Sequence, residues 1–152
     1  MNLTVRSCVS QTEWDGFLQD HPAQTFLQSW EWGAFNEKQG HTIHRFIFDH
    51  ASKMVAIALI IEVRARRGSY FLCAHGPIFS PEADPRTVFA ALSDQLEKEG
   101  RTRSIDFIRL CPLLFDTEEN RHLISQLNYR SAPIHQSPEL SWVLPLEKSE
   151  EE

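Results

Sequence analysis

Histidine is a frequent catalytic and metal-binding residue, and this chain of 152 residues contains seven histidines. His41 and His44 stand three residues apart in a segment of β-strand character, and the other histidines are isolated. Zinc ligands must converge on one point, and this spacing does not provide such a geometry, so we expect no metal site. The sequence also lacks the motifs of a nucleophile elbow, a P-loop, a dinucleotide-binding loop and a zinc protease. Motifs therefore assign no catalytic residue.

Arginines provide the next candidates for chemistry. One group contains Arg64, Arg66 and Arg67, and further along the chain lie Arg101 and Arg103. Close arginines could hold a phosphate through bidentate contacts, although a solvated strand end is the more frequent explanation of such a group. Arg109 differs because it lies inside the apolar stretch IDFIRL. A buried arginine needs a partner, so Arg109 is either structurally paired or a polar residue at the floor of a cleft.

Two tryptophans stand two residues apart in the stretch FLQSWEWGAFNEKQG, which covers residues 26–40. Ser29 is a plausible helix cap, Glu31 suits the first turn, and Gly40 can end the helix. Side chains two positions apart on a helix point about 200° away from each other. Trp30 and Trp32 therefore cannot both face the core, and the second is expected to line a cleft or face a partner.

Apolar periodicity places these residues on an alternation of strands and helices. Expected strands cover residues 3–5, 42–48, 54–63, 69–73, 105–110 and 140–146. Expected helices begin at Ser10, at Ser29, at Asp84 or Pro85, and within 116–119, and the third should end at Gly100. The run MVAIALIIEV is apolar almost throughout, as in a central strand that is buried on both faces. The order is β-α-α-β-β-β-α-β-α-β, which predicts an α/β (α+β) fold with a mixed, mostly antiparallel sheet flanked by helices.

Composition sets limits on the partners. A content of 41% apolar and 11% aromatic residues can supply the core of one domain. The formal charge of −6 argues against general binding to DNA phosphates. No apolar run approaches the roughly 20 residues of a membrane span, and the N-terminus does not resemble a secretion signal. Cys8, Cys73 and Cys111 are too scattered for a disulfide framework, so we expect reduced thiols in a cytoplasmic protein.

The strand order resembles that of the GNAT acyltransferases, which bind acetyl-coenzyme A. Those enzymes cradle the pyrophosphate of the coenzyme with backbone amides of a glycine-bearing loop at a helix N-terminus. The corresponding stretch here is AHGPIFSPEADPRT, with one glycine and three prolines. Proline removes amide donors, so we expect no coenzyme A and no other cofactor.

Five segments, in order, resemble the first half of the Fem-type aminoacyltransferases, which build the interpeptide bridges of bacterial peptidoglycan. They are FLQSWEWGAFNEKQG, VAIALIIEVR, YFLCAHGPIF, FIRLCPLLFDTEENRHLISQLNYRSAPIH and ELSWVLPLEKSEEE. The resemblance implies transfer of an amino acid from aminoacyl-tRNA to the stem-peptide amine of a UDP-linked or lipid-linked muramyl precursor. It implies two GNAT-like domains in tandem without coenzyme A, of which residues 1–146 would be the first and 147–152 the start of a passage to the second.

The resemblance also names candidate substrate-binding residues. They are Trp32, Lys38, His75, Gly76, Pro77 and Arg109, with His135 as a further one. Members that act on a UDP-linked precursor can carry a lysine two residues after the helix tryptophan. This chain has Ala34 there, so either Lys38 replaces that lysine or the precursor differs. The second domain would supply surface for aminoacyl-tRNA, so this chain alone is not expected to complete the transfer.

Two other functions stay open on the sequence. One is a module that binds the precursor without catalysis, and the other is an acetyl-CoA-dependent N-acetyltransferase, which has the right element order but the wrong loop. The expected location is the cytoplasm, and peripheral contact with the inner face of the membrane is a further alternative. The donated amino acid, the precursor and the oligomeric state cannot be inferred from the residues.

Overall fold

The computed structural model of the chain describes residues 2–23, 25–66 and 68–134. Its elements are β1 (Thr4–Ser7), α1 (Gln11–Asp20), α2 (Trp30–Lys38), β2 (Thr42–His50), β3 (Lys53–Ala65), β4 (Gly68–Ala74), β5 (Ile78–Phe79), α3 (Pro85–Arg103), β6 (Phe107–Cys111) and α4 (Glu118–Gln126). The predicted order is confirmed over these residues, with β5 as an addition. The strand predicted at 140–146, the passage at 147–152 and His135 lie outside the described residues.

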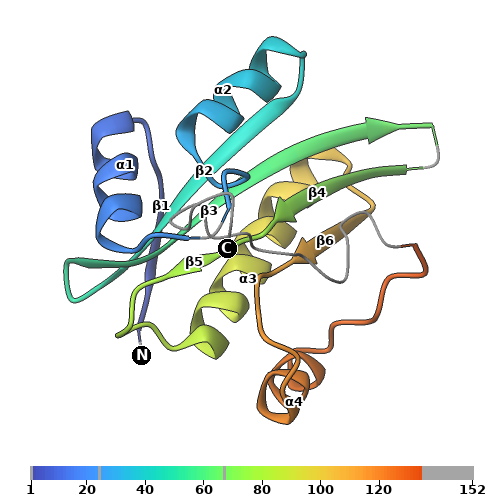
Figure 1. Cartoon of the computed structure of the whole chain (residues 1–152). Helices are drawn as coiled ribbons and strands as arrows, with labels where there is room; N and C mark the ends of the chain where they lie inside the picture. Colours follow the sequence, from blue (N-terminus) through green and yellow to red (C-terminus); the bar gives the residue numbers. More distant parts are fainter. Residues whose placement is uncertain (1, 24, 67, 135–152) are drawn as a thin grey trace, which may run out of the picture.

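The strands form one sheet in the order β1-β2-β3-β4-β6, and β5 pairs with part of β3 (Figure 1). Neighbouring strands run antiparallel except β4 and β6, which are parallel. The predicted mixed, mostly antiparallel sheet is therefore confirmed. The turn between β2 and β3 consists of Ala51 and Ser52, both with positive φ, and is shorter than the stretch 49–53 left between the two expected strands.

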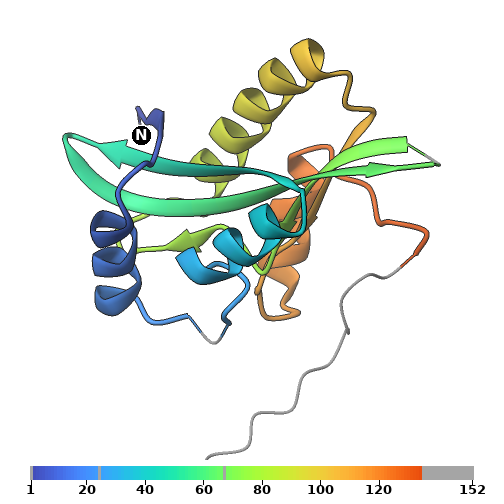
Figure 2. The ribbon, with the colours of Figure 1, turned by 90° about the horizontal axis from the view of Figure 1, so that it is seen from above.

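Helices cover both faces of the sheet. Figure 2 shows α3 on one face, with α1 and α2 on the opposite face. Side chains of β3 alternate between the two faces of the sheet. Ala58 and Ile60 pack in the cluster under α3, whereas Ile57 and Leu59 pack in the cluster under α1 and α2. Burial on both faces explains why this strand is apolar almost throughout.

Helix α3 continues beyond the predicted end. Gly100 does not stop the helix; it is buried, and a Cβ there would stand 3.4 Å from Ile105 and 3.6 Å from Phe71. The helix ends at Arg103, and Ser104 follows in the left-handed region, with its amide donating to Gly100 O. The glycine therefore allows close packing of the helix on the sheet, and the prediction of its end was wrong by three residues because Ser104 takes the capping conformation.

The last two elements are less buried than the rest. No residue of α4 is fully buried, and Leu123, Ile124 and Leu127 are only half-buried. Strand β6 likewise has no fully buried residue. Within the described residues, the apolar side chains of this helix therefore face only a shallow core.

Candidate substrate-binding site

Helix α2 is fixed to the sheet by a buried arginine. Ser29 caps the helix by accepting from the Trp32 amide at 3.0 Å, as predicted. From β2, Arg45 places its guanidinium 4.0 Å from the centre of the Trp30 ring, and it donates to Trp30 O at 3.2 Å and to Glu37 Oε1 at 3.1 Å. Gly33 leaves the room that this guanidinium fills. The first tryptophan of the motif therefore holds the helix in place.

The second tryptophan, Trp32, lies in the first turn of the same helix and is partly exposed. The Trp32 ring is half-buried, stacks on Phe35 at a centroid distance of 5.4 Å and meets Phe26 edge-on at 5.2 Å. Phe26 and Phe35 are 65% and 50% exposed. Among the tryptophans of the described residues, the fully buried one is instead Trp14 of α1, whose ring meets Trp30 edge-on.

A buried glutamine joins the two strands next to this helix. The β3 ladder pairs with β5 at Ala56 and Ile57, and with β4 only from Ile61 onward. Between these two pairings, Gln28 accepts from the Leu59 amide at 2.7 Å and donates to Ala74 O at 2.7 Å. Its side chain therefore replaces strand pairing where β3 and β4 separate. The sequence offered no periodicity or motif that could have identified Gln28.

His75 follows directly after β4 at the point where β4 and β6 end their pairing. The His75 amide donates to Cys111 O at 2.8 Å, and its φ of 56° lies in the left-handed region, which is uncommon for histidine. Its ring atom Nδ1 is 2.9 Å from Thr25 Oγ1, so the α1–α2 connection fixes the imidazole. The side chain is half-buried, so the imidazole is both oriented and partly accessible to a ligand.

The two residues after His75 are buried. Gly76 precedes Pro77 through a cis peptide bond, and a Cβ on Gly76 would stand 2.6 Å from the Gln28 side chain. Any side chain here would displace Gln28 from between the strands. The structure therefore places Gly76 and Pro77 behind the surface that His75 reaches.

The remaining two candidates lie apart from His75. Lys38 is exposed in the last turn of α2. Arg109 donates to Ile134 O at 3.0 Å and lies 5.9 Å from the centre of the Tyr70 ring. Among the described residues Arg109 forms no ion pair, and no contact joins it to Trp32 or His75. The adjacent residues Phe26 and Thr25 thus contact Trp32 and His75 respectively, whereas among the described residues no contact joins Lys38 or Arg109 to either of them.

A carboxylate occupies the N-terminus of α3. Asp84 accepts from the amides of Arg86 at 3.2 Å and Thr87 at 3.3 Å, and also from the Thr87 hydroxyl. The hydrogen bond from this hydroxyl is the largest cause of a pKa of Asp84 below its usual value, and the two amides add to it. Pro85, the next residue, has no amide hydrogen. The first turn therefore presents a negative charge and occupied donors, which do not fit a pyrophosphate group.

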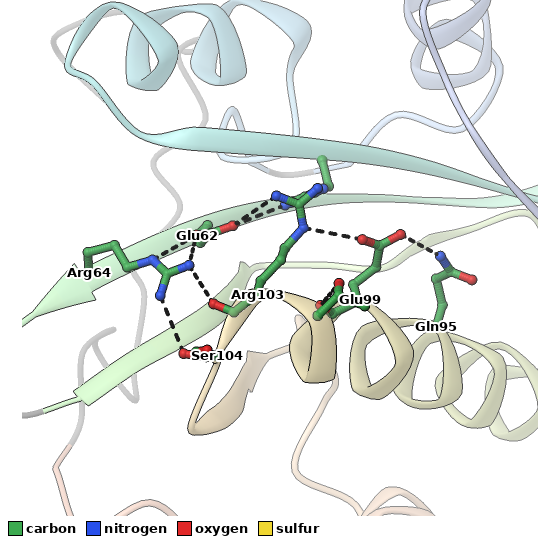
Figure 3. Close-up of polar contacts among 8 residues, drawn as sticks. Glu62, Arg64, Gln95, Glu99, Arg103 and Ser104 are labelled. Atoms are coloured by element: carbon green, nitrogen blue, oxygen red, sulfur yellow. Dashed lines mark hydrogen bonds and ion pairs between the residues drawn. The ribbon is translucent and has the colours of Figure 1, made fainter.

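A second polar cluster lies at the other end of α3 (Figure 3). Glu62 is 6% exposed and pairs with Arg64, and its Oε2 is 3.7 Å from Arg103 Nη1. Arg64 also donates to the backbone oxygens of Arg103 and Ser104, and so caps the helix. Arg103 also forms an ion pair with Glu99, with 3.2 Å between Arg103 Nε and Glu99 Oε2. These arginines are engaged in structure, and Arg67 lies outside the described residues.

Other types of site receive no support from the described part of the chain. It contains no cluster of histidine, cysteine and acidic side chains suited to a metal ion. None of its helices combines the length and the apolar character that a membrane crossing requires. Cys8 and Cys73 are buried and Cys111 is half-buried, all three as free thiols. A shallow depression of about 660 Å³ runs along α4, and it includes none of the predicted residues.

Solved structures with this fold include acetyltransferases and a second kind of protein. A predicted acetyltransferase from Clostridium acetobutylicum, solved with acetyl-CoA, has a TM-score of 0.57 at 14% identity, with 92% of this chain and 96% of that chain covered. An aminoglycoside acetyltransferase from an uncultured soil metagenomic sample has a TM-score of 0.59 at 17% identity, with coverage of 93% and 100%. Both likenesses show the GNAT-like fold.

The second kind of protein is FemX, with a TM-score of 0.66 and 18% identity. The likeness covers 84% of this chain but only 31% of FemX, so the chain spans about a third of that protein. No curated protein matched the sequence significantly. The sequence profile of the FemAB family matches residues 9–130. Four of the five segments that suggested this relationship lie wholly or mostly within that range, and the fifth, residues 139–152, lies beyond it. The chain belongs to the FemAB family.

Proposed function

We propose that this chain is the precursor-binding domain of an aminoacyltransferase of peptidoglycan bridge synthesis. The observation that carries the proposal is the FemAB family match over residues 9–130. The whole enzyme would transfer an amino acid from aminoacyl-tRNA to the stem-peptide amine of a UDP-linked or lipid-linked muramyl precursor. Surface for the tRNA would come from outside these 152 residues.

The reaction defines what this domain has to do. A deprotonated amine of the precursor attacks the ester carbonyl of the aminoacyl-tRNA, an amide bond forms, and the terminal hydroxyl of the tRNA leaves. Positioning of the amine can supply much of the acceleration. Trp32 and His75 are the candidates for precursor contacts because both are partly exposed and both contact the α1–α2 connection, Trp32 through Phe26 and His75 through Thr25. Both would act by binding the precursor and orienting its amine.

Acetyl-CoA is the ligand that the fold alone would suggest, because several structural neighbours are acetyltransferases. The arrangement at α3 supports the proposal against this alternative. Asp84 occupies the first-turn amides, and a pyrophosphate there would meet its carboxylate at close range. We therefore propose that the chain functions without coenzyme A.

Calorimetric titration of the 152-residue chain tests the proposal. The titrants are a UDP-linked muramyl pentapeptide and, for comparison, acetyl-CoA. We expect saturable binding of the precursor and none of acetyl-CoA, and Trp32→Ala should weaken precursor binding while the fold remains intact by circular dichroism. Binding of acetyl-CoA alone would identify an N-acetyltransferase instead. Full precursor affinity in Trp32→Ala would remove Trp32 from the site.

A further inference from the structure

Strand β6 is the last strand of the sheet in the described part of the chain. It pairs with β4, and no described strand pairs with its other side (Figure 1). In a parallel pair, alternate residues direct their N–H and C=O groups to the neighbouring strand. Cys111 O accepts from the His75 amide next to β4, so Cys111 and Arg109 face β4. The N–H and C=O groups of Ile108 and Leu110 therefore point away from β4, and we call this side of β6 its open edge.

Apolar side chains are exposed in the same part of the chain. Seven large apolar residues are exposed among those described, and four of them come from β6 and the connections on either side of α4. These four are Phe107, Leu113, Phe115 and Ile134. The central strands β2 and β3, in contrast, expose no large apolar residue. An open strand edge beside exposed apolar residues is a site where a further strand can add.

The chain returns to β6 at the last described residue. Arg109 Nη1 donates to Ile134 O at 3.0 Å. The Tyr129 hydroxyl donates to a carbonyl oxygen of α3 at 3.3 Å, so the connection after α4 is held at both α3 and β6. Five residues, 135–139, lie between Ile134 and Leu140. A stretch of this length spans up to roughly 20 Å, whereas the five residues of β6 cover about 17 Å. Leu140 can therefore reach either end of β6.

The segment LSWVLPL, residues 140–146, has the pattern of an added edge strand. Its even positions are apolar, and side chains at alternate positions of a strand share one face. These positions are Leu140, Trp142, Leu144 and Leu146. Pro145 has no N–H group, which sheets tolerate on an edge strand. The core cluster under α3 reaches the sheet edge at Ile108 and Leu110, which are only half-buried against it. An apolar strand face can extend this cluster across the open edge.

We propose that residues 140–146 pair with the open edge of β6 as an additional strand. The N–H and C=O groups of Ile108 and Leu110 then gain partners, and Trp142 and Leu144 continue the core cluster under α3. A segment of the same chain is favoured over a second copy, because the short tether after Ile134 keeps its effective concentration in the millimolar range. The inference goes beyond the proposed function and does not depend on which ligand the domain binds.

Amide hydrogen exchange of the ¹⁵N-labelled 152-residue chain tests the pairing at the amides of Ile108 and Leu110. Both should exchange slowly in the parent chain. Val143→Pro and Trp142→Pro should each speed their exchange by about 10-fold or more, because proline lacks the N–H group and disrupts a strand pair. Ser149→Pro is the matched control, since residue 149 lies beyond the segment, and both rates should stay unchanged.

Two further variants test which face of the added strand is buried. Trp142→Asp places a charge on the apolar face and should release the amides of Ile108 and Leu110 in the same way. Ser141→Asp places the same charge on the opposite face and should keep both amides protected. The amides of β2 and β3 report on the fold as a whole, and they should stay protected in every variant.

Each other outcome has a definite meaning. Rapid exchange of Ile108 and Leu110 in the parent chain would show that the edge stays open and would overturn the proposal. Slow exchange that no substitution at 142 or 143 changes would overturn it as well, because another group would then cover β6. If that protection falls on dilution, the occupant is a second copy. If the proline variants also lose protection in β2 and β3, they have unfolded, and the comparison of Trp142→Asp with Ser141→Asp decides.

Discussion

At the scale of single residues, the candidate site depends on side chains that fit without spare room. Arg45 occupies the space beside Gly33, and Gln28 occupies the space beside Gly76. Each of the two side chains is buried and polar, so each must keep its partners to avoid a large cost. Two glycines therefore decide whether α2 and the end of β4 keep their positions.

Gly33→Ala should destabilise the fold by about 2 to 3 kcal/mol, because the new methyl group would stand 2.9 Å from Leu59 Cδ1 and would collide with the Arg45 guanidinium. Chemical denaturation measures the change. Gly16→Ala in α1 is the matched control, since nothing lies within 4 Å of its Cβ position, and it should stabilise by about 0.5 to 1 kcal/mol. Equal effects in the two variants would show that Arg45 does not depend on the space at Gly33.

His44 links the stability of the fold to pH. Burial lowers the pKa of His44, and Arg103 adds to this effect, while Glu62 and Glu99 oppose it. The ring lies against Phe46 and Phe71, and its Nε2 is 3.6 Å from Glu62 Oε2. Below the ordinary histidine pKa of 6.5, the unfolded chain takes up a proton that the folded chain does not. Stability should therefore be full above pH 6.5 and fall as the pH decreases toward the lowered pKa.

The variant His44→Gln tests this dependence in denaturation curves between pH 7.5 and 5. The slope of stability against pH should be shallower in His44→Gln than in the parent chain, because glutamine does not titrate. His41→Gln is the control, since His41 is exposed, and it should leave the slope unchanged. A slope that is the same in all three proteins would contradict the assignment to His44.

At the scale of elements, charged side chains stand at both termini of α3, and the cap at its start supports the proposal that the chain functions without coenzyme A. Asp84 caps the start of α3, and Arg64 donates to the carbonyl groups at its end. Charges of the favourable sign therefore stand at both ends of the longest helix. Because Asp84 already uses the first-turn amides, a competing anion has no free donor there.

Asp84→Ala should lower stability by about 1 kcal/mol at pH 7, the usual effect of losing a helix cap. The carboxylate has a lowered pKa in the folded chain, so its contribution is present above its ordinary pKa of 3.8 and is lost as the pH falls through the lowered value. The difference between Asp84→Ala and the parent should accordingly narrow below pH 3.8. Asp94→Ala, at an exposed position inside the same helix, should change stability by less than about 0.5 kcal/mol.

Local patterns predicted these elements well where the pattern is strong. A β-rich run located β2, a continuous apolar run located β3, and a helical apolar stripe located α3. The Ser29 cap located the start of α2, as expected. Ser10 begins its helix as expected and accepts from the Glu13 amide. In a capping box the residue at the position of Glu13 would bond back to the cap amide, but the Glu13 carboxylate pairs with Arg6 instead. Arg6 lies on β1, so this ion pair depends on tertiary structure that a local capping pattern does not contain.

At the scale of the whole molecule, the parts that sequence could not predict are contacts between distant segments. Gln28 hydrogen-bonds to the backbone of two residues that lie 31 and 46 positions further along the chain. Glu62 forms ion pairs with one arginine of β3 and one of α3. The two-residue strand β5 is too short for any periodicity. The resemblance to Fem-type enzymes identified the family, but it did not indicate that Phe26 and Phe35 extend the surface of Trp32.

The proposed function is a domain that would hold a muramyl precursor on the surface between α2 and the end of β4. Trp32 and His75 lie on this surface, whereas α3 begins with an occupied cap. The acetyltransferase neighbours show that the same fold is also found with acetyl-CoA. The identity of the ligand and its binding site distinguish precursor binding from acetyl-CoA binding on this fold.

The measurement that tests this claim most directly is an amide chemical-shift map of the ¹⁵N-labelled chain during titration with UDP-linked muramyl pentapeptide. We predict that the Trp32 and His75 amides shift and saturate together, while the Arg86 and Thr87 amides at the start of α3 stay unchanged. Shifts of Arg86 and Thr87 on titration with acetyl-CoA, without any response of Trp32 and His75 to the muramyl compound, would contradict the account.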